Sequence, residues 1–126
     1  MGGESDLSRL LRGLTPRLYP DRYTFAETAE SVLAEGQFAL VREDEGLTSI
    51  HADQLGQWAR ISLEIHSSLD AVGLTGVMAS RLADLGISVN IIAALHHDHL
   101  FVPWDRREEA LECLQSLQRE AEERPV

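Results

Sequence analysis

The stretch HSSLDAVGLTG, which begins at His66, holds the densest group of side chains with chemical potential in this sequence. Its residue types fit a hydrolytic set made of His66, Ser67 or Ser68, and Asp70 or the more distant Asp98. Adjacent residues of a strand project to opposite faces, so His66 is poorly directed at Ser67. The sequence also lacks the GxSxG turn that exposes a nucleophilic serine. We therefore predict a protein that is not an enzyme.

The same stretch suits the binding of a small molecule at the start of a helix. Gly73 and Gly76 allow close approach to the main chain, and the first N–H groups of a helix lack intrahelical partners and favour a carboxylate. The Ser67 and Ser68 hydroxyls can donate or accept, and Asp70 can accept from an ammonium group. A free amino acid carries both charges. The alternative is that Ser68 or Asp70 only caps the helix and the glycines only permit close packing.

A second polar group, HHDH at residues 96–99, contains ligand types suited to zinc or nickel, with His66 as a further candidate. Four consecutive residues of a tight turn cannot all point inward, so a metal site would need a ligand from elsewhere. The alternative is a polar hairpin turn in which Asp98 caps backbone amides. We predict no metal and no cofactor, and keep a metal-binding protein as an alternative function.

Composition excludes several function classes. A net charge of −10 argues against a nucleic-acid partner. All eleven cationic residues are arginines and the sequence has no lysine, which excludes Schiff-base catalysis and the lysine of a phosphate-binding P-loop. Cys113 is the single cysteine, which excludes an intrachain disulfide. No apolar run approaches the roughly 20 residues that cross a bilayer, and the N-terminus lacks a signal-peptide pattern. We expect a cytoplasmic protein without a membrane partner.

The helices and strands that must position these polar residues are predicted most clearly in residues 59–123. Ile61, Leu63 and Ile65 alternate with polar residues, which predicts a half-buried strand over 59–67. Apolar residues from Leu74 onward recur at helical spacing until Gly86 ends the helix. The sequence then predicts strands at 87–95 and 99–103 and a helix at 105–123 capped by Asp105.

The first half is predicted to follow the same order. A leucine-rich helix over residues 7–14 ends at Pro16 and Pro20, which lead into an extended segment. The remaining elements are a strand at 23–28, a short helix at 27–37 closed by Gly36, strands at 38–42 and 47–51, and a short helix near 51–57.

This shared order predicts an α+β fold of two ferredoxin-like βαββα units, with an antiparallel sheet and helices on one face. We divide the chain into residues 1–57, the N-terminal helix plus a first unit, and residues 58–126, a second unit. Each unit lacks a closing strand. We expect the halves to complete one another or to pair with a second chain, because open sheet edges invite pairing.

Three stretches resemble the ACT-domain proteins, specifically small stand-alone bacterial proteins with tandem ACT-like units. They are EGLTSI (45–50), ISLEIHSSLDAVGLTGVMASRLADLGISVNIIAALHHDHLFVP (61–103) and the weaker LLRGLTPRLYPDRYTFAET (10–28). The resemblance implies a regulatory ligand sensor that binds an amino acid without catalysis. It places the ligand where a first strand ends and a first helix begins, and it implies a homodimer through sheet edges.

The ligand-binding residues predicted on this basis are Ser67, Ser68, Leu69, Asp70, Val72, Gly73, Leu74, Asn90 and Ile91. Backbone amides of residues 72–74 would hold the ligand's carboxylate. The resemblance suggests that Asn90 lines the cavity, and an exposed strand position is its alternative. Glu45 and Thr48 are secondary candidates, on the first-half hairpin. A protein-interaction subunit without a ligand remains a further alternative function.

Overall fold

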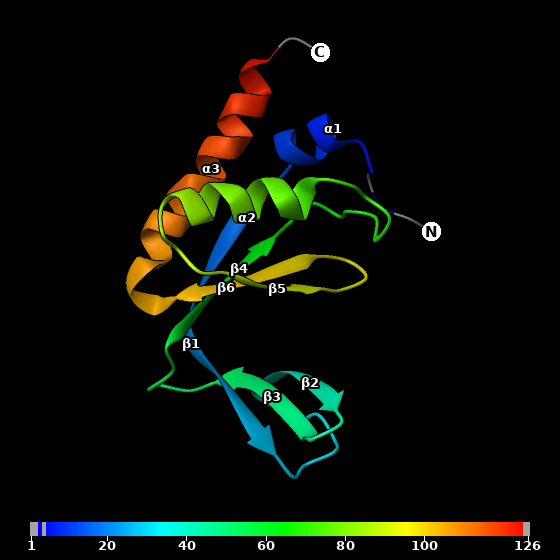
Figure 1. The fold of residues 1–126 in the computed structure, drawn as a ribbon, viewed down its shortest axis with the longest axis vertical. Helices are drawn as coiled ribbons and strands as arrows, with labels where there is room; N and C mark the ends of the chain where they lie inside the picture. Colours follow the sequence, from blue (N-terminus) through cyan, green and yellow to red (C-terminus); the bar gives the residue numbers. More distant parts are fainter. Residues whose placement is uncertain (1–2, 4, 125–126) are drawn as a thin grey trace.

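The computed structural model describes residue 3 and residues 5–124, which form six antiparallel strands and three α-helices (Figure 1). The sheet has the strand order β2-β3-β1-β4-β6-β5. In chain order the elements are α1 (Leu7–Arg12), β1 (Pro16–Thr28), β2 (Gln37–Glu43), β3 (Gly46–Ala52), β4 (Trp58–Leu63), α2 (Leu74–Asp84), β5 (Asn90–Ala93), β6 (Asp98–Pro103), the short 3₁₀-helix η1 (Trp104–Arg106) and α3 (Arg107–Glu123).

Strand β1 belongs to both halves of the sheet. Its C-terminal part, Tyr23–Thr28, pairs with β3, and its N-terminal part pairs with β4 from Pro16 onward. The β1–β4 register shifts between Leu18 and Arg22, around a proline that has no N–H to donate to a ladder. Strand β1 thus joins the β2–β3 hairpin to the β4–β6–β5 part of one continuous sheet.

All three α-helices pack on one face of the sheet (Figure 1). Alternate strand residues such as Ile61, Leu63 and Leu100 are fully buried beneath them, together with Met78 and Leu114 from the helices. This arrangement confirms the predicted α+β class with an antiparallel sheet and helices on one face. Among the described residues, no helix is both long and apolar enough to cross a membrane.

The opposite face is partly covered by the β2–β3 hairpin, which curls below the sheet (Figure 1). Phe101 of β6 lies at the centre of the contact and is fully buried. Tyr23, Phe25 and Phe38 meet its ring edge-on, with centroid distances of 5.5, 5.5 and 5.4 Å. Edge-to-face packing of this kind is the favoured geometry of aromatic pairs.

Several local predictions are wrong. The predicted helix at 27–37 is absent, and Val32 and Leu33 within it are 74% and 54% exposed. The predicted helix near 51–57 is a turn closed by a hydrogen bond from Gly56 N–H to Asp53 O. The first half therefore lacks the helices that the repeat required. Asp105 lies in η1, so it does not cap α3, whose first residue is Arg107.

Candidate functional site

The junction between β4 and α2 begins after Leu63 and ends where Gly73 opens the helix. Gly73 has a φ of 104°, in the left-handed region that favours glycine. No described side chain caps the start of α2, and its first turn contains no acidic residue. The first N–H groups of this 11-residue helix are therefore left for solvent or a ligand, at the end where the helix dipole is positive.

The loop before α2 is shaped by Ser68. Its Oγ atom accepts a hydrogen bond from the Asp70 N–H at 3.1 Å, and its carbonyl accepts one from Ala71 N–H at 3.0 Å. The Asp70 side chain is exposed and bonds to no described residue. Leu69 and Val72 are also exposed, at 65% and 83%. The turn thus presents a carboxylate and two apolar side chains to solvent.

Ser67 and Leu74 point into the protein. Both are buried, and Ser67 Oγ donates to Asp98 Oδ2 at 3.4 Å. Burial raises the pKa of Asp98, while the hydrogen bond from Ser67 and the charge of His97 act in the opposite direction. The hydroxyl of Ser67 is therefore engaged with the interior of the protein, whereas Gly73 at the other end of the loop is exposed.

Helix α1 forms one wall of the junction. A Cβ atom added at Gly73 would lie 3.2 Å from Leu7 Cδ2, and one added at Gly3 would lie 2.2 Å from the His66 carbonyl oxygen. The N-terminal segment therefore packs against both ends of the loop. Glycine at position 73 therefore meets two requirements, a positive φ and the absence of a Cβ atom beside Leu7.

The two predicted residues of β5 face opposite sides of the sheet. Ile91 pairs with Leu100 and packs into the core beneath the helices. Asn90 pairs with Phe101 and is exposed on the helix-free face. Since α2 lies on the helix side, only Ile91 is on the same side as the junction.

The structure does not bring the hairpin residues to the junction. Glu45 lies in the β2–β3 turn, beside a surface pocket of about 320 Å³ that Glu27 and Thr28 also line. Thr48 donates a hydrogen bond to Glu43 within the same hairpin. The hairpin lies below the sheet and the junction above it (Figure 1), so Glu45 and Thr48 do not face the start of α2 in the same chain.

The side chains of the HHDH turn diverge. Asp98 faces Ser67, His99 Nδ1 lies 2.7 Å from Ser62 Oγ, and the His96 ring lies 5.6 Å from the His66 ring. Within residue 3 and residues 5–124, no three His, Cys, Asp or Glu side chains are grouped to hold a metal ion. The alternative metal site at residues 96–99 therefore has no ligand set there.

The hydrolytic alternative also lacks its geometry. Ser67 bonds to Asp98 and Ser68 to the backbone of its own turn. In the described part of the chain, neither hydroxyl forms a hydrogen bond with His66. A serine nucleophile needs its base within hydrogen-bond reach, so these residues are not arranged as a triad.

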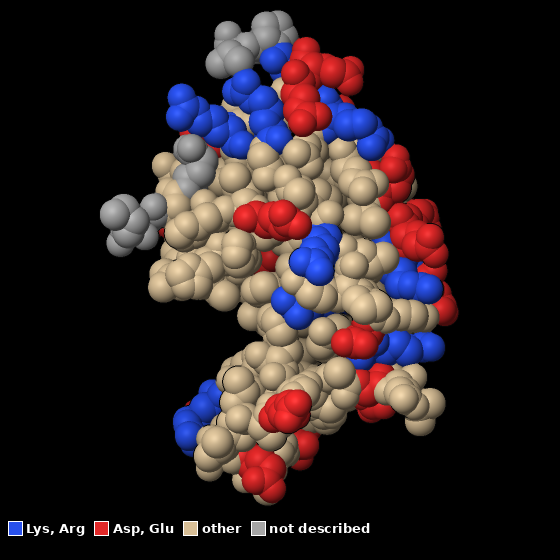
Figure 2. All heavy atoms as spheres, turned by 180° about the vertical axis from the view of Figure 1, so that it is seen from behind, with Lys and Arg blue, Asp and Glu red and all other residues tan. Residues whose placement is uncertain are grey.

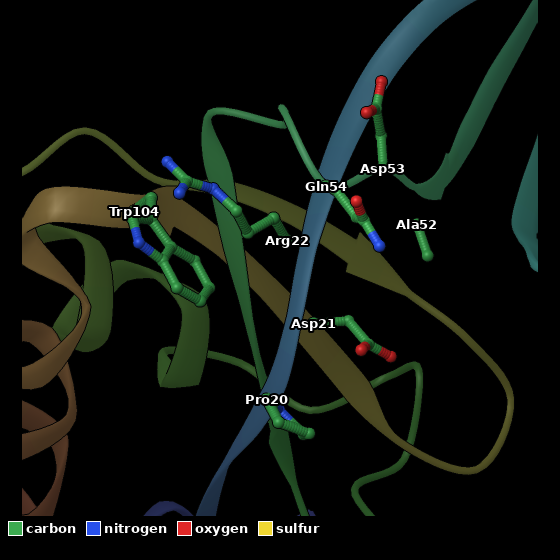
Figure 3. Close-up of a pocket in the computed structure, with 7 residues that line it drawn as sticks. All are labelled: Pro20, Asp21, Arg22, Ala52, Asp53, Gln54 and Trp104. Atoms are coloured by element: carbon green, nitrogen blue, oxygen red, sulfur yellow. The ribbon is translucent and has the colours of Figure 1, made fainter.

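A pocket of about 370 Å³ lies beside Arg22 and Trp104, which the sequence did not single out (Figure 3). The Arg22 guanidinium lies 4.7 Å from the Trp104 ring centroid, and its Nε donates to Gly56 O at 2.8 Å. Figure 3 shows Asp21 and Asp53 on the other side of β1 from this stack. The charged groups therefore do not converge on one point.

A groove of about 280 Å³ lies on the helix-free face, and we name it the Arg60 groove. It is lined by Arg17, Tyr19, Arg60, Ser62, Leu63, Glu64, His97 and His99. Sequence reasoning missed it. The sequence did contain one indication of this groove, on the polar side of the strand predicted over 59–67. There Arg60, Ser62 and Glu64 alternate with apolar residues. The partner strand was not expected to begin at Pro16, so Arg17 and Tyr19 were not placed beside it.

Comparisons with known proteins agree with this architecture. Two family models of the ACT domain match the chain, at residues 2–66 and 56–116. A crystal structure of a Vibrio cholerae protein of unknown function, titled a possible transport protein, is 33% identical with a TM-score of 0.75 and covers 89% of this chain and 95% of its own. An Agrobacterium tumefaciens structure shares the fold at 17% identity, with a TM-score of 0.65, covering 83% of this chain and 89% of its own. A search of curated proteins finds no match.

Proposed function

Because this chain belongs to the ACT-domain family, whose members are regulatory domains that bind small ligands, we propose that it binds an amino acid or similar small zwitterion at the start of α2. Binding is reversible and changes no covalent bond of the ligand. The ligand-contacting residues in this proposal are those of the junction, residues 67–74.

The observation that carries the proposal is the uncapped start of α2 at Gly73. The N–H groups of residues 72–74 would hold the ligand's carboxylate, assisted by the positive end of the helix dipole. The exposed Asp70 carboxylate lies in the same loop and would accept from the ligand's ammonium group. The exposed side chains of Leu69 and Val72 would contact the carbon skeleton.

A thermal-shift panel of the common amino acids tests this proposal, with titration calorimetry of any that stabilise the protein. Asp70→Asn removes the negative charge that would pair with the ammonium group and should weaken binding about tenfold or more. Asp84→Asn is the matched control, because Asp84 is an exposed aspartate in the last turn of the same helix. A panel without any stabilising amino acid, or equal losses in both variants, would refute the proposal.

Regulation requires that the ligand favour one arrangement of the protein over another, since only differential affinity shifts such an equilibrium. In the part of the chain that the structure describes, β2 and β5 are the edge strands of the sheet, and Val41 on β2 is 42% exposed. A homodimer formed through these edges is the arrangement that we propose, in the cytoplasm. Light scattering with and without amino acids distinguishes constitutive from ligand-driven pairing, and a monomer under both conditions would contradict it.

A further inference from the structure

The helix-free face of the sheet carries a row of polar side chains from three adjacent strands. Arg17 of β1 pairs with Ser62 of β4, and Ser62 pairs with His99 of β6. Residues two apart on a strand share a face, so Tyr19 and Arg60 lie on the same side of the sheet as this row. All five side chains line the Arg60 groove.

Arg60 is held in place by neighbours that leave its charge unneutralised. Its guanidinium carbon lies 3.9 Å from the Tyr19 ring centroid and 4.5 Å from that of Phe38. Its Nε donates to Ser62 Oγ at 2.9 Å, and Nη1 lies 3.5 Å from the Tyr23 hydroxyl. A guanidinium has five N–H donors, so several remain for a ligand, on a group whose orientation is already fixed.

A second guanidinium lies beside the same ring. The Arg17 guanidinium carbon is 4.9 Å from the Tyr19 centroid. Neither Arg17 nor Arg60 forms an ion pair within the described part of the chain, where the salt bridges join other arginines to glutamates. Like charges repel one another, so an anion bound by both arginines would relieve the repulsion between them.

The groove is a local exception in an acidic protein. The chain has a net charge of −10, yet the groove contains two arginines against the single exposed carboxylate of Glu64. Figure 2 shows a hollow between the helix-bearing part of the molecule and the curled hairpin. The two guanidinium groups outnumber the single carboxylate of the lining, so the groove attracts anions.

We propose that the Arg60 groove binds a small dicarboxylate, with Arg60 and Arg17 each holding one carboxylate. Arginine suits this role because its planar fork matches a carboxylate in two-point hydrogen bonding. A monoanion would leave one of the two guanidinium charges without a partner. The volume of about 280 Å³ is at the lower end of small-molecule sites, which favours a short molecule.

This site is separate from the one proposed at the start of α2. The groove is on the helix-free face, and α2 covers the other face (Figure 1). A protein with both sites could respond to two metabolites of different charge. The two proposals can therefore fail independently.

Titration calorimetry with succinate, at ionic strength held constant with sodium chloride, tests the proposal. The wild-type protein should bind succinate saturably and bind butyrate, which has one carboxylate on a similar chain, about tenfold more weakly or worse. Arg17→Gln and Arg60→Gln should each weaken succinate binding by a similar factor. Arg17 is exposed, so Arg17→Gln should leave the fold intact. This variant therefore tests the proposal even if Arg60→Gln, which loses the ring contacts of Arg60, fails to fold.

Controls separate specific binding from general charge effects. Arg42→Gln removes an exposed arginine of β2 outside the groove and should leave succinate affinity unchanged, as should Asp70→Asn in the other site. An absence of saturable binding, unchanged affinity in Arg17→Gln, or an equal loss in Arg42→Gln would overturn the proposal. Inorganic phosphate that binds more tightly than succinate and depends on Arg17 would overturn the dicarboxylate assignment.

Discussion

The Ser67 hydroxyl donates to Asp98 Oδ2 at 3.4 Å, and both side chains are buried where β4 ends and β6 begins. The distance is long for a hydroxyl donor, so the bond offsets little of the cost of removing a carboxylate from water. Asp98 therefore has a raised pKa, for which burial is the main cause. The contact links the proposed ligand loop to the central sheet through a carboxyl group that takes up a proton more readily than an ordinary aspartate.

Asp98→Asn should stabilise the protein at neutral pH. Because the pKa of Asp98 is raised on folding, the folded chain binds its proton more tightly, and the free energy of unfolding falls as pH rises above the ordinary aspartate pKa. The amide keeps a hydrogen-bond acceptor for Ser67 and removes the charge. We expect a higher free energy of unfolding than in the wild-type protein at pH 7 and no difference at pH 3. Thermal unfolding followed by circular dichroism measures both, and a lower melting temperature at pH 7 would contradict the expectation.

His99 should make the protein sensitive to acid. Burial, followed by the charges of Arg60 and His97, lowers the pKa of His99 to about 4. An unfolded histidine titrates near pH 6.5, so the unfolded chain binds more protons between these values. The stability that neutral His99 contributes is present above pH 6.5 and is lost as pH falls through 4.

His99→Gln should flatten this acid dependence. Urea unfolding between pH 4 and 7 measures the slope in wild-type and variant. Asp98 contributes a slope of opposite sign, so Asp98→Asn should steepen the acid loss that His99→Gln removes. If the free energy of unfolding had the same pH slope in the wild type, His99→Gln and Asp98→Asn, then folding would change the pKa of neither His99 nor Asp98.

Two glycines of the α2 region should respond oppositely to alanine. Gly73 has a φ of 104° and Leu7 Cδ2 lies 3.2 Å from where its Cβ would be, so Gly73→Ala should destabilise by about 1–3 kcal/mol. Gly76 is exposed within the helix with no heavy atom within 4 Å of its Cβ position. Gly76→Ala should stabilise by about 0.5–1 kcal/mol. Chemical denaturation distinguishes them, and stabilisation by both would contradict the backbone geometry.

Phe101 should control the docking of the β2–β3 hairpin. Phe101→Ala removes the ring that three aromatic side chains meet edge-on and should cost about 3–5 kcal/mol. Hydrogen exchange should then accelerate over β2 and β3 before the rest of the sheet. Leu100→Ala is the control, because the adjacent residue is buried on the helix side. Equal acceleration of the hairpin in both variants would show that Phe101 has no special role there.

Periodicity predicted the elements that bury a continuous apolar face. The apolar spacing from Leu74 onward became α2, and the alternation around Ile61 became β4, because both patterns report contact with the helix-side core. The predicted helix at 27–37 failed because Val32 and Leu33 have nothing to pack against. Helical residues without a tertiary partner do not form a stable helix at this length.

The candidate sites were predictable only where they are local in sequence. The junction at residues 67–74 could be described from one contiguous stretch, although not the inward orientation of Ser67, which depends on Asp98 from another strand. The Arg60 groove depends on the register that sets Arg17 opposite Ser62. Such a register cannot be derived without knowing which strands are neighbours.

The 13-residue strand β1 has a consequence for dissecting this protein. A peptide beginning at Trp58 would leave the β4 backbone groups that pair with Pro16, Arg17 and Leu18 open to other chains. Residues 16–28 and 58–103 therefore cannot be replaced independently by the corresponding segments of a relative. Chimeras with relatives should keep residues 16–28 and 58–103 from one parent, and a crossover between them should yield aggregates.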